Sequence, residues 1–240
     1  MEPVLEVPNL CKYYPGFRLE GVTFSLQPGR ICGFLGRNGA GKTTTIKSIL
    51  GLVHPDAGTV KILGQDFSSQ ETALRSRIGY ASGGVDFYPR KRLSEISRQT
   101  RPFYPQWDEN TYHRLIERFH LDESKCIREL SEGMKVKYQL ALALSHGAQL
   151  LILDEPTSGL DPVSRAELTD IFQVLAKQGT AILFSTHITA DLLSCAQDIL
   201  YLRQGQLLAA KPLPDFLADH PDCANLDEIM VTLEKEKCEL

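Results

Sequence analysis

The segment GRNGAGKT, residues 36–43, constrains the fold of this chain more than any other stretch. It fits the pattern G-x-x-x-x-G-K-[ST], follows the apolar run RICGFL and precedes TTTIKSILGLV, whose apolar spacing predicts a helix. A random chain would match this pattern in about one case in a hundred, before the strand and helix are also required. Glycines let successive backbone N–H groups face an anion, and the helix N-terminus adds its dipole. The segment predicts a phosphate-binding loop; the alternative is a structural glycine turn.

Two side chains of this loop carry the expected chemistry. Lys42 can reach the β- and γ-phosphates of a nucleotide, and the hydroxyl of Thr43 can bind Mg²⁺. The other loop residues expected to contact the nucleotide are Gly36, Arg37, Asn38, Gly39, Ala40, Gly41 and Thr44.

The segment LLILDEP, residues 150–156, predicts an apolar strand that ends in two carboxylates. Open α/β sheets bind ligands at the carboxyl ends of their strands, so Asp154 and Glu155 are expected at that edge. Asp154 can hold Mg²⁺ through water, and Glu155 can polarise the water that attacks a γ-phosphate. Beside a phosphate-binding loop, this strand end predicts nucleotide hydrolysis.

Composition and charge exclude several other classes of protein. The 240 residues are 42% hydrophobic and 23% charged, which is typical of a globular chain with one sizeable core. The formal net charge of -4 gives no support for a nucleic-acid partner. The N-terminus lacks the pattern of a secretory signal and no run of eighteen apolar residues occurs, so we expect the chain itself not to cross a membrane. The six cysteines form no C-x-x-C pair, as expected for reduced thiols in the cytosol.

The order of apolar runs predicts an α/β fold. Strands are expected at VLEV, LEGVTFSL, RICGFL and TVKIL, and helices within residues 93–119, where RPFYPQWDEN interrupts them. A helix (GMKVKYQLALALSHG), a strand (QLLILDEP), a helix over 162–178, a strand (TAILFSTH) and a hairpin (ILYL, LLAA) follow. Uniformly apolar strands belong in a sheet covered on both faces. We predict a mainly parallel sheet with an N-terminal antiparallel β subdomain, a small helical subdomain and a tail of one or two peripheral helices with a frayed end.

A second helix start also has the chemistry of an anion site. In LSEGM, residues 130–134, Ser131 is a favoured N-cap, and its hydroxyl with the N–H groups around Gly133 can face an anion. The alternative is that Ser131 only caps the helix.

The order of these motifs resembles the nucleotide-binding subunit of an ABC transporter, which has a P-loop NTPase core. LSEGM is similar to the LSGGQ signature of that family, while SGLD (residues 158–161) and STH (residues 185–187) resemble its D-loop and switch histidine. The resemblance implies that Ser131 and Gly133 bind the γ-phosphate of ATP held by a partner subunit in a head-to-tail dimer. It also implies that His187 reaches the γ-phosphate, that Asp161 lines the nucleotide site and that Tyr14 stacks on adenine, with Tyr13 as the competitor.

The resemblance covers nearly the whole chain and implies its organisation and partner. Residues 1–83 and 130–211 would form the catalytic core of a single domain, about 84–129 the helical subdomain and 212–240 the tail. The implied partner is a membrane permease, so the chain is expected on the inner face of the cell membrane. The sequence is similar to the branch that exports antibiotics, lipids or other hydrophobic cargo. An importer ATPase and a soluble ATPase that acts on ribosomes or DNA are the alternatives.

One position departs from the family pattern. In IGYASGG, residues 78–84, the family's Q-loop glutamine position falls on Gly83, which has no side chain to contact Mg²⁺ or water. Either Thr43 and Asp154 suffice for Mg²⁺ and the glycine pair acts as a hinge, or turnover depends on the permease to order this loop.

Overall fold

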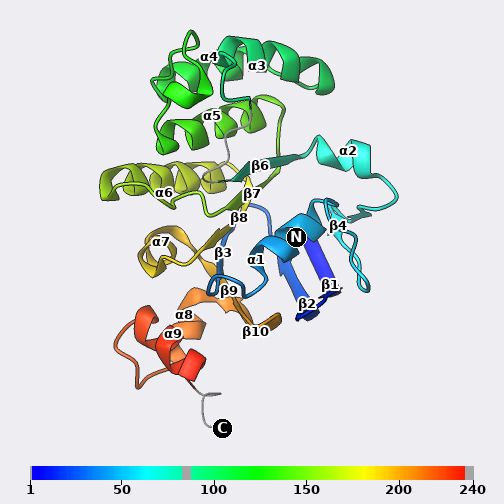
Figure 1. Ribbon diagram of the computed structural model, residues 1–240, viewed down its shortest axis with the longest axis vertical. Coiled ribbons are helices and arrows are strands. Elements are labelled where there is room, and N and C mark those ends of the chain that lie inside the picture. The colour runs from blue at the N-terminus through cyan, green and yellow to red at the C-terminus, as the bar shows by residue number, and fades with distance from the viewer. Residues whose placement is uncertain (1, 83–87, 236–240) are drawn as a thin grey trace.

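The computed structural model of this chain describes residues 2–82 and 88–235, and Figure 1 shows its ribbon. Within these residues, ten strands form one sheet in the order β5-β4-β1-β2-β10-β9-β3-β8-β7-β6. The strands are β1 (Leu5–Tyr14), β2 (Phe17–Leu26), β3 (Ile31–Leu35), β4 (Lys61–Ile62), β5 (Gln65–Asp66), β6 (Ile78–Ser82), β7 (Leu150–Asp154), β8 (Ala181–Thr186), β9 (Asp198–Arg203) and β10 (Gln206–Pro212).

The helices of the described residues lie around this sheet (Figure 1). They are α1 (Lys42–Ile49), α2 (Glu71–Arg75), α3 (Leu93–Thr100), α4 (Glu109–Arg118), α5 (Glu132–Ser145), α6 (Pro162–Lys177), α7 (Thr189–Cys195), α8 (Leu213–Ala218) and α9 (Leu226–Lys235), with 3-10 turns η1 (Arg101–Phe103) and η2 (Ile127–Glu129). In Figure 1, α3, α4 and α5 gather at one end of the molecule, and α8 and α9 lie at the other. No helix within these ranges is long and apolar enough to span a membrane.

The predicted fold class is confirmed by the strand directions. The neighbours β9, β3, β8, β7 and β6 all run parallel to one another, whereas β1 pairs antiparallel with β2 and β4. The carboxyl ends of β3, β6, β7 and β8 therefore meet at one edge of the sheet, where open α/β sheets bind ligands.

Apolar residues on both faces of the sheet build the core. All five residues of β7 are buried. Leu151 and Leu153 pack in the cluster that contains α5 and α6 residues, while Leu150 and Ile152 pack with α1 and the N-terminal strands. Because both faces are covered, β7 and β8 are buried at every position, and their runs LLIL and AILF are apolar, as expected for central strands.

Two element boundaries differ from the sequence prediction. The helix expected over TTTIKSILGLV ends at Ile49, because Gly51 adopts φ 66°, the left-handed conformation that ends many helices. Strand β1 continues to Tyr14, well beyond VLEV, because its polar residues pair with β2.

The C-terminal tail forms two helices, α8 and α9, as predicted, at one end of the molecule (Figure 1). Leu226 and Ile229 of α9 are each 1% exposed and belong to the same hydrophobic cluster as α5 and α6 residues. The helix α9 is therefore amphipathic and packs one apolar face against the core. The expected frayed end, residues 236–240, lies outside the described residues, and the boundaries drawn for the core, helical subdomain and tail stay predictions.

Candidate active site

The glycine loop connects β3 to α1 as predicted. At two of its positions, neighbouring atoms leave no room for a side chain. A Cβ atom on Gly36 would lie 2.4 Å from the carbonyl oxygen of Leu202. Gly41 has φ 114°, and a Cβ atom there would lie 2.8 Å from Cζ of Phe17. A side chain at either position would therefore displace the loop or its neighbours.

The N-terminus of α1 is suited to an anion. Its N-cap is Gly41, no side chain of the described residues caps it, and its first turn contains no acidic residue. The first N–H groups of a helix lack partners within the helix and carry its positive dipole end. Thr43 is exposed in this turn and Thr44 is partly buried. The structure thus places all nine predicted loop residues on the loop and the first turn of α1.

Lys42 and Glu155 form an ion pair across this loop. The Lys42 ammonium donates to the carbonyl oxygen of Gly36 at 2.6 Å, and its Nζ lies 3.3 Å from Oε1 of Glu155. The Lys42 side chain is 5% exposed, so its charge needs such partners. The predicted phosphate-binding lysine and the predicted catalytic carboxylate therefore lie in contact.

Asp154 ends β7 and Glu155 follows it, and Ser185 on the adjacent strand β8 contacts both residues. The Ser185 hydroxyl donates to Oδ1 of Asp154 at 2.6 Å and accepts the backbone N–H of Glu155 at 2.9 Å. Asp154 pairs with Ser185 in the β7–β8 register. Glu155 adopts φ 50°, an uncommon conformation for a residue other than glycine. Sequence reasoning assigned Ser185 no role, because its role depends on strand register.

His187 completes the cluster just after β8. Its Nδ1 lies 2.8 Å from Oε2 of Glu155, so the two oxygens of this carboxylate contact Lys42 and His187 separately. The His187 side chain is 45% exposed, which leaves its ring accessible to a ligand. The structure thereby brings Lys42, Asp154, Glu155 and His187 together from three separate parts of the chain.

The second helix start lies on α5. Ser131 is its N-cap, and the hydroxyl accepts the N–H of Met134 at 3.3 Å, which confirms the predicted capping. The nearest side-chain atoms to a Cβ atom on Gly133 would be 3.7 Å away, on Leu160 and Ser164. Among the described residues, no hydrogen bond or ion pair connects Ser131 or Gly133 with the cluster at Glu155.

The other predicted residues lie at separate positions. Tyr14 ends β1, is 41% exposed and pairs in register with Phe17, whose ring lies beside Gly41; sequence reasoning missed Phe17. Asp161 caps α6, since its carboxylate accepts from Val163 N–H at 3.0 Å and Ser164 N–H at 3.1 Å. Gly83 lies outside the described residues.

The residues present fit a magnesium ion that is held mainly by a nucleotide. The described residues contain no group of three or more His, Cys, Asp or Glu side chains that could hold a metal ion. Protein sites for Mg²⁺ with nucleotides commonly offer one or two oxygen ligands and leave the rest to phosphates and water. Asp154, 6% exposed, and the exposed hydroxyl of Thr43 meet that requirement.

Comparisons with known proteins indicate the family to which this chain is similar. Residues 19–158 match the family described as ABC transporter. The chain is 32% identical over 216 residues to the bacitracin transport ATP-binding protein BcrA of Bacillus licheniformis, which covers 88% of this chain and 71% of the relative. It is 34% identical over 220 residues to the SkfA peptide export ATP-binding protein SkfE of Bacillus subtilis, covering 89% and 91%.

A solved structure shows the same similarity. The ATP-binding subunit of an ABC transporter superposes with a TM-score of 0.86 and 32% sequence identity, over 97% of this chain and all of that chain.

Proposed function

This chain belongs to the ABC transporter family of ATP-hydrolysing subunits, and from that premise we propose that it powers an exporter through a membrane permease. The similar proteins are named for bacitracin transport and for export of the SkfA peptide. We therefore propose a peptide antibiotic, a lipid or another hydrophobic molecule as the cargo. The permease would provide the path across the membrane.

The observation that carries the proposal is the shared carboxylate of Glu155. It contacts Lys42 through one oxygen and His187 through the other. The N-terminus of α1, which no side chain of the described residues caps, begins at Lys42. A lysine that binds phosphate is thus paired with an acid that can act as a base on water. Phosphoryl transfer needs groups positioned in this way and charge stabilisation more than covalent help.

These contacts give an order of events. When the phosphates of ATP bind the loop 36–41 and the first turn of α1, the Lys42 ammonium moves from Glu155 to the phosphate oxygens, which carry more negative charge. Glu155 is then free to take a proton from the water that attacks the γ-phosphorus, and the bond to the ADP oxygen breaks. His187 holds the second oxygen of Glu155 in place. Bound by Asp154 and Thr43, Mg²⁺ would neutralise charge that develops on the phosphates.

The position of Ser131 supports a head-to-tail dimer. Its helix end contacts no residue of the cluster around Glu155, although it has the geometry of an anion site. In our proposal, Ser131 and Gly133 bind ATP held on the loop of a partner chain. Asp161 and Tyr14 would line the same nucleotide. Closure of two chains around two ATP molecules then transmits force to the permease.

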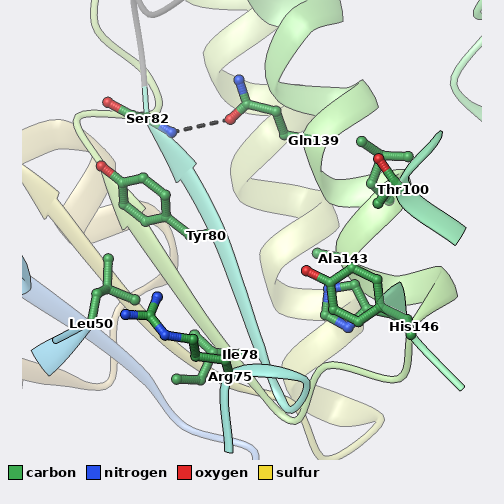
Figure 2. Close-up of a pocket in the computed structure, with 11 residues that line it drawn as sticks. Leu50, Arg75, Ile78, Tyr80, Ser82, Thr100, Gln139, Ala143 and His146 are labelled. Atoms are coloured by element: carbon green, nitrogen blue, oxygen red, sulfur yellow. Dashed lines mark hydrogen bonds between the residues drawn. The ribbon is translucent and has the colours of Figure 1, made fainter. Parts of the chain in front are cut away.

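A cleft beside β6 is the proposed docking site of the permease. It has a volume of about 470 Å³ and lies between the helices that carry Thr100 and His146 and the segment from Arg75 to Ser82 (Figure 2). The lining combines apolar side chains such as Leu50 and Ile78 with the guanidinium of Arg75. A short helix of a partner could place apolar and acidic residues there.

Replacement of Glu155 by glutamine tests the proposed function. Glu155→Gln keeps the shape of the side chain but removes the base, so we expect it to bind ATP and accumulate as a dimer with ATP and Mg²⁺. Size-exclusion chromatography measures the dimer, and phosphate release measures hydrolysis, which should fall at least about a hundredfold. Glu167→Gln is the matched control, because Glu167 pairs with Lys137 away from the cluster. If Glu155→Gln stayed monomeric while the unmodified chain dimerised, the role of this carboxylate would be wrong.

A further inference from the structure

Gln139 lies in the middle of α5, and its side chain reaches the end of β6. The residue is 8% exposed, and its Oε1 accepts a hydrogen bond from the backbone N–H of Ser82 at 3.1 Å. Figure 2 shows the amide oxygen turned toward Ser82 and the amide nitrogen turned away from it. Burial of an amide costs free energy unless it is hydrogen-bonded. The contact is therefore a specific one between α5 and this strand.

The hydrogen bond lies beside the proposed magnesium ligand. In the described residues β6 is the last strand of the sheet, so its outer N–H groups face no further strand. Such groups need another partner when they are covered by a helix, and Gln139 provides one for Ser82. Ser82 lies opposite Asp154 in the parallel register of β6 and β7. Gln139 thus fixes the strand end that flanks the Asp154 carboxylate.

The same helix begins at the second anion site. Gln139 follows Ser131 by eight residues, a distance of about 12 Å along a helix axis. The hydroxyl of Tyr138, next to Gln139, donates a hydrogen bond to the carbonyl oxygen of Leu93 at 2.7 Å. This bond attaches α5 to the first residue of α3. A helix held at several points moves as a unit, and a displacement at its first turn reaches the middle.

We propose that Gln139 is a positioning residue that couples the two ATP sites of the dimer. ATP of the partner chain binds the Ser131 end of α5, and the hydrogen bond from Ser82 to Gln139 transmits the resulting helix position to the strand end beside Asp154. Contact of α5 with the partner's nucleotide thereby strengthens a bond that already exists in the single chain and further fixes the strand end beside Asp154. This inference rests on the proposed head-to-tail dimer. In this proposal, Gln139 of α5 makes the side-chain contact to the end of β6. A glycine such as Gly83 has no side chain with which to make such a contact.

Variants of Gln139 in the Glu155→Gln background test the coupling. Gln139→Leu removes the acceptor with little change in volume, whereas Gln139→Glu keeps an oxygen acceptor at the same distance. The measurements are the affinity of the isolated monomer for ATP, by fluorescence of a labelled nucleotide, and the ATP concentration that gives half-maximal dimer. We expect monomer affinity within about twofold for all chains. The half-maximal concentration should rise about tenfold for Gln139→Leu, as expected for loss of one hydrogen bond, and recover with Gln139→Glu.

The outcomes separate this inference from the function on which it rests. If Glu155→Gln alone failed to dimerise, the proposed dimer and the coupling would both be overturned. If it dimerised and Gln139→Leu left the half-maximal ATP concentration unchanged, only the coupling would be overturned. A loss of thermal stability with no change in that concentration would mean that Gln139 serves the fold alone.

Amide hydrogen exchange tests the same coupling without a change at Gln139. In the Glu155→Gln chain, the Ser82 amide should exchange at least about fivefold more slowly once ATP has driven dimerisation, because the hydrogen bond to Gln139 then tightens. The slowing should follow the same ATP concentration as the dimer. An exchange rate that is equal in monomer and dimer would overturn the inference even if Gln139→Leu failed to fold.

Discussion

Ser185 is a fully buried residue whose hydroxyl contacts two groups of the active site at once. It donates to the Asp154 carboxylate at 2.6 Å and accepts the N–H of Glu155 at 2.9 Å. Without the hydroxyl, Oδ1 of Asp154 loses this donor, and the N–H of Glu155 keeps only the carbonyl oxygen of Ser185, at 3.2 Å. Hydrogen bonds to charged groups contribute about 1.5–3 kcal/mol. The placement of both acids therefore depends on this side chain.

We predict that Ser185→Ala lowers kcat for ATP hydrolysis by about tenfold or more and the free energy of unfolding by about 1–3 kcal/mol. Ser145→Ala is the matched control, because Ser145 is equally buried but donates to the carbonyl oxygen of Ala141 within α5. It should lose similar stability and keep its kcat. Phosphate release and urea unfolding provide the two measurements. Equal kcat values for the two variants would contradict the role of Ser185.

At the scale of single residues, the sequence predicted the acids and bases of the candidate site but not the residues that hold them in place. Lys42, Asp154, Glu155 and His187 stand in local motifs, so their types and spacing were readable, and the structure brings them together. Ser185 becomes important only because β7 and β8 pair in the register that places it opposite Asp154. Such pairings join residues far apart in sequence and leave no local pattern.

Among the elements, the C-terminal end of α5 is attached through His146 to the end of α2, just before β6. Its ring stacks on Tyr104 with centroids 4.0 Å apart, and its Nδ1 lies 3.1 Å from the carbonyl oxygen of Ser76. Burial lowers the pKa of His146 and outweighs the opposite effect of the Ser76 carbonyl. Arg75 and Tyr80 line the same cleft. Burial therefore favours the neutral form of the His146 ring.

The lowered pKa of His146 makes the stability of the fold depend on pH. An unfolded histidine has a pKa of about 6.5, so below that value the unfolded chain binds more protons than the folded one. Stability is then complete above about pH 6.5 and falls as the pH decreases. We predict that the Tm of the unmodified chain drops more between pH 7.5 and 5.5 than that of His146→Gln, in a thermal scan. His54→Gln, at an exposed position, is the control and should retain the full drop. Parallel Tm curves for the unmodified chain and His146→Gln would show that His146 does not titrate in this way.

The elements also show why boundaries are harder to predict than types. The strand-loop-helix order around residues 36–43 follows from local glycine and apolar patterns, and the structure has it. The end of α1 depends on the left-handed conformation of Gly51, and the length of β1 depends on pairing with β2. The end of α1 is encoded locally by Gly51, but the sequence contains several glycines and does not mark this one as a helix end. The length of β1 is set by a contact between strands, which leaves no local pattern.

At the scale of the whole molecule, α9 joins the tail to both sides of the active site. Asp227 accepts a hydrogen bond from Thr189 at 2.8 Å, two residues after His187. Glu234 accepts one from the Tyr201 hydroxyl at 3.0 Å and lies 3.8 Å from Arg37 of the phosphate loop. The tail is thus packed on the catalytic core.

Removal of one apolar side chain from α9 tests whether the tail and the helical end unfold together. Ile229 is 1% exposed and shares one hydrophobic cluster with Trp107, the one tryptophan of the chain, which precedes α4. We predict that Ile229→Ala lowers the free energy of unfolding by about 2–4 kcal/mol, measured by Trp107 fluorescence in urea. Val231→Ala, on the exposed side of the same helix at 49% exposure, should change it by less than about 0.5 kcal/mol. Because Trp107 lies at the opposite end of the molecule from α9, its transition shifts only if both ends unfold cooperatively. A Trp107 transition that stayed in place, while circular dichroism showed an earlier loss of helix, would mean that α9 unfolds as a separate unit.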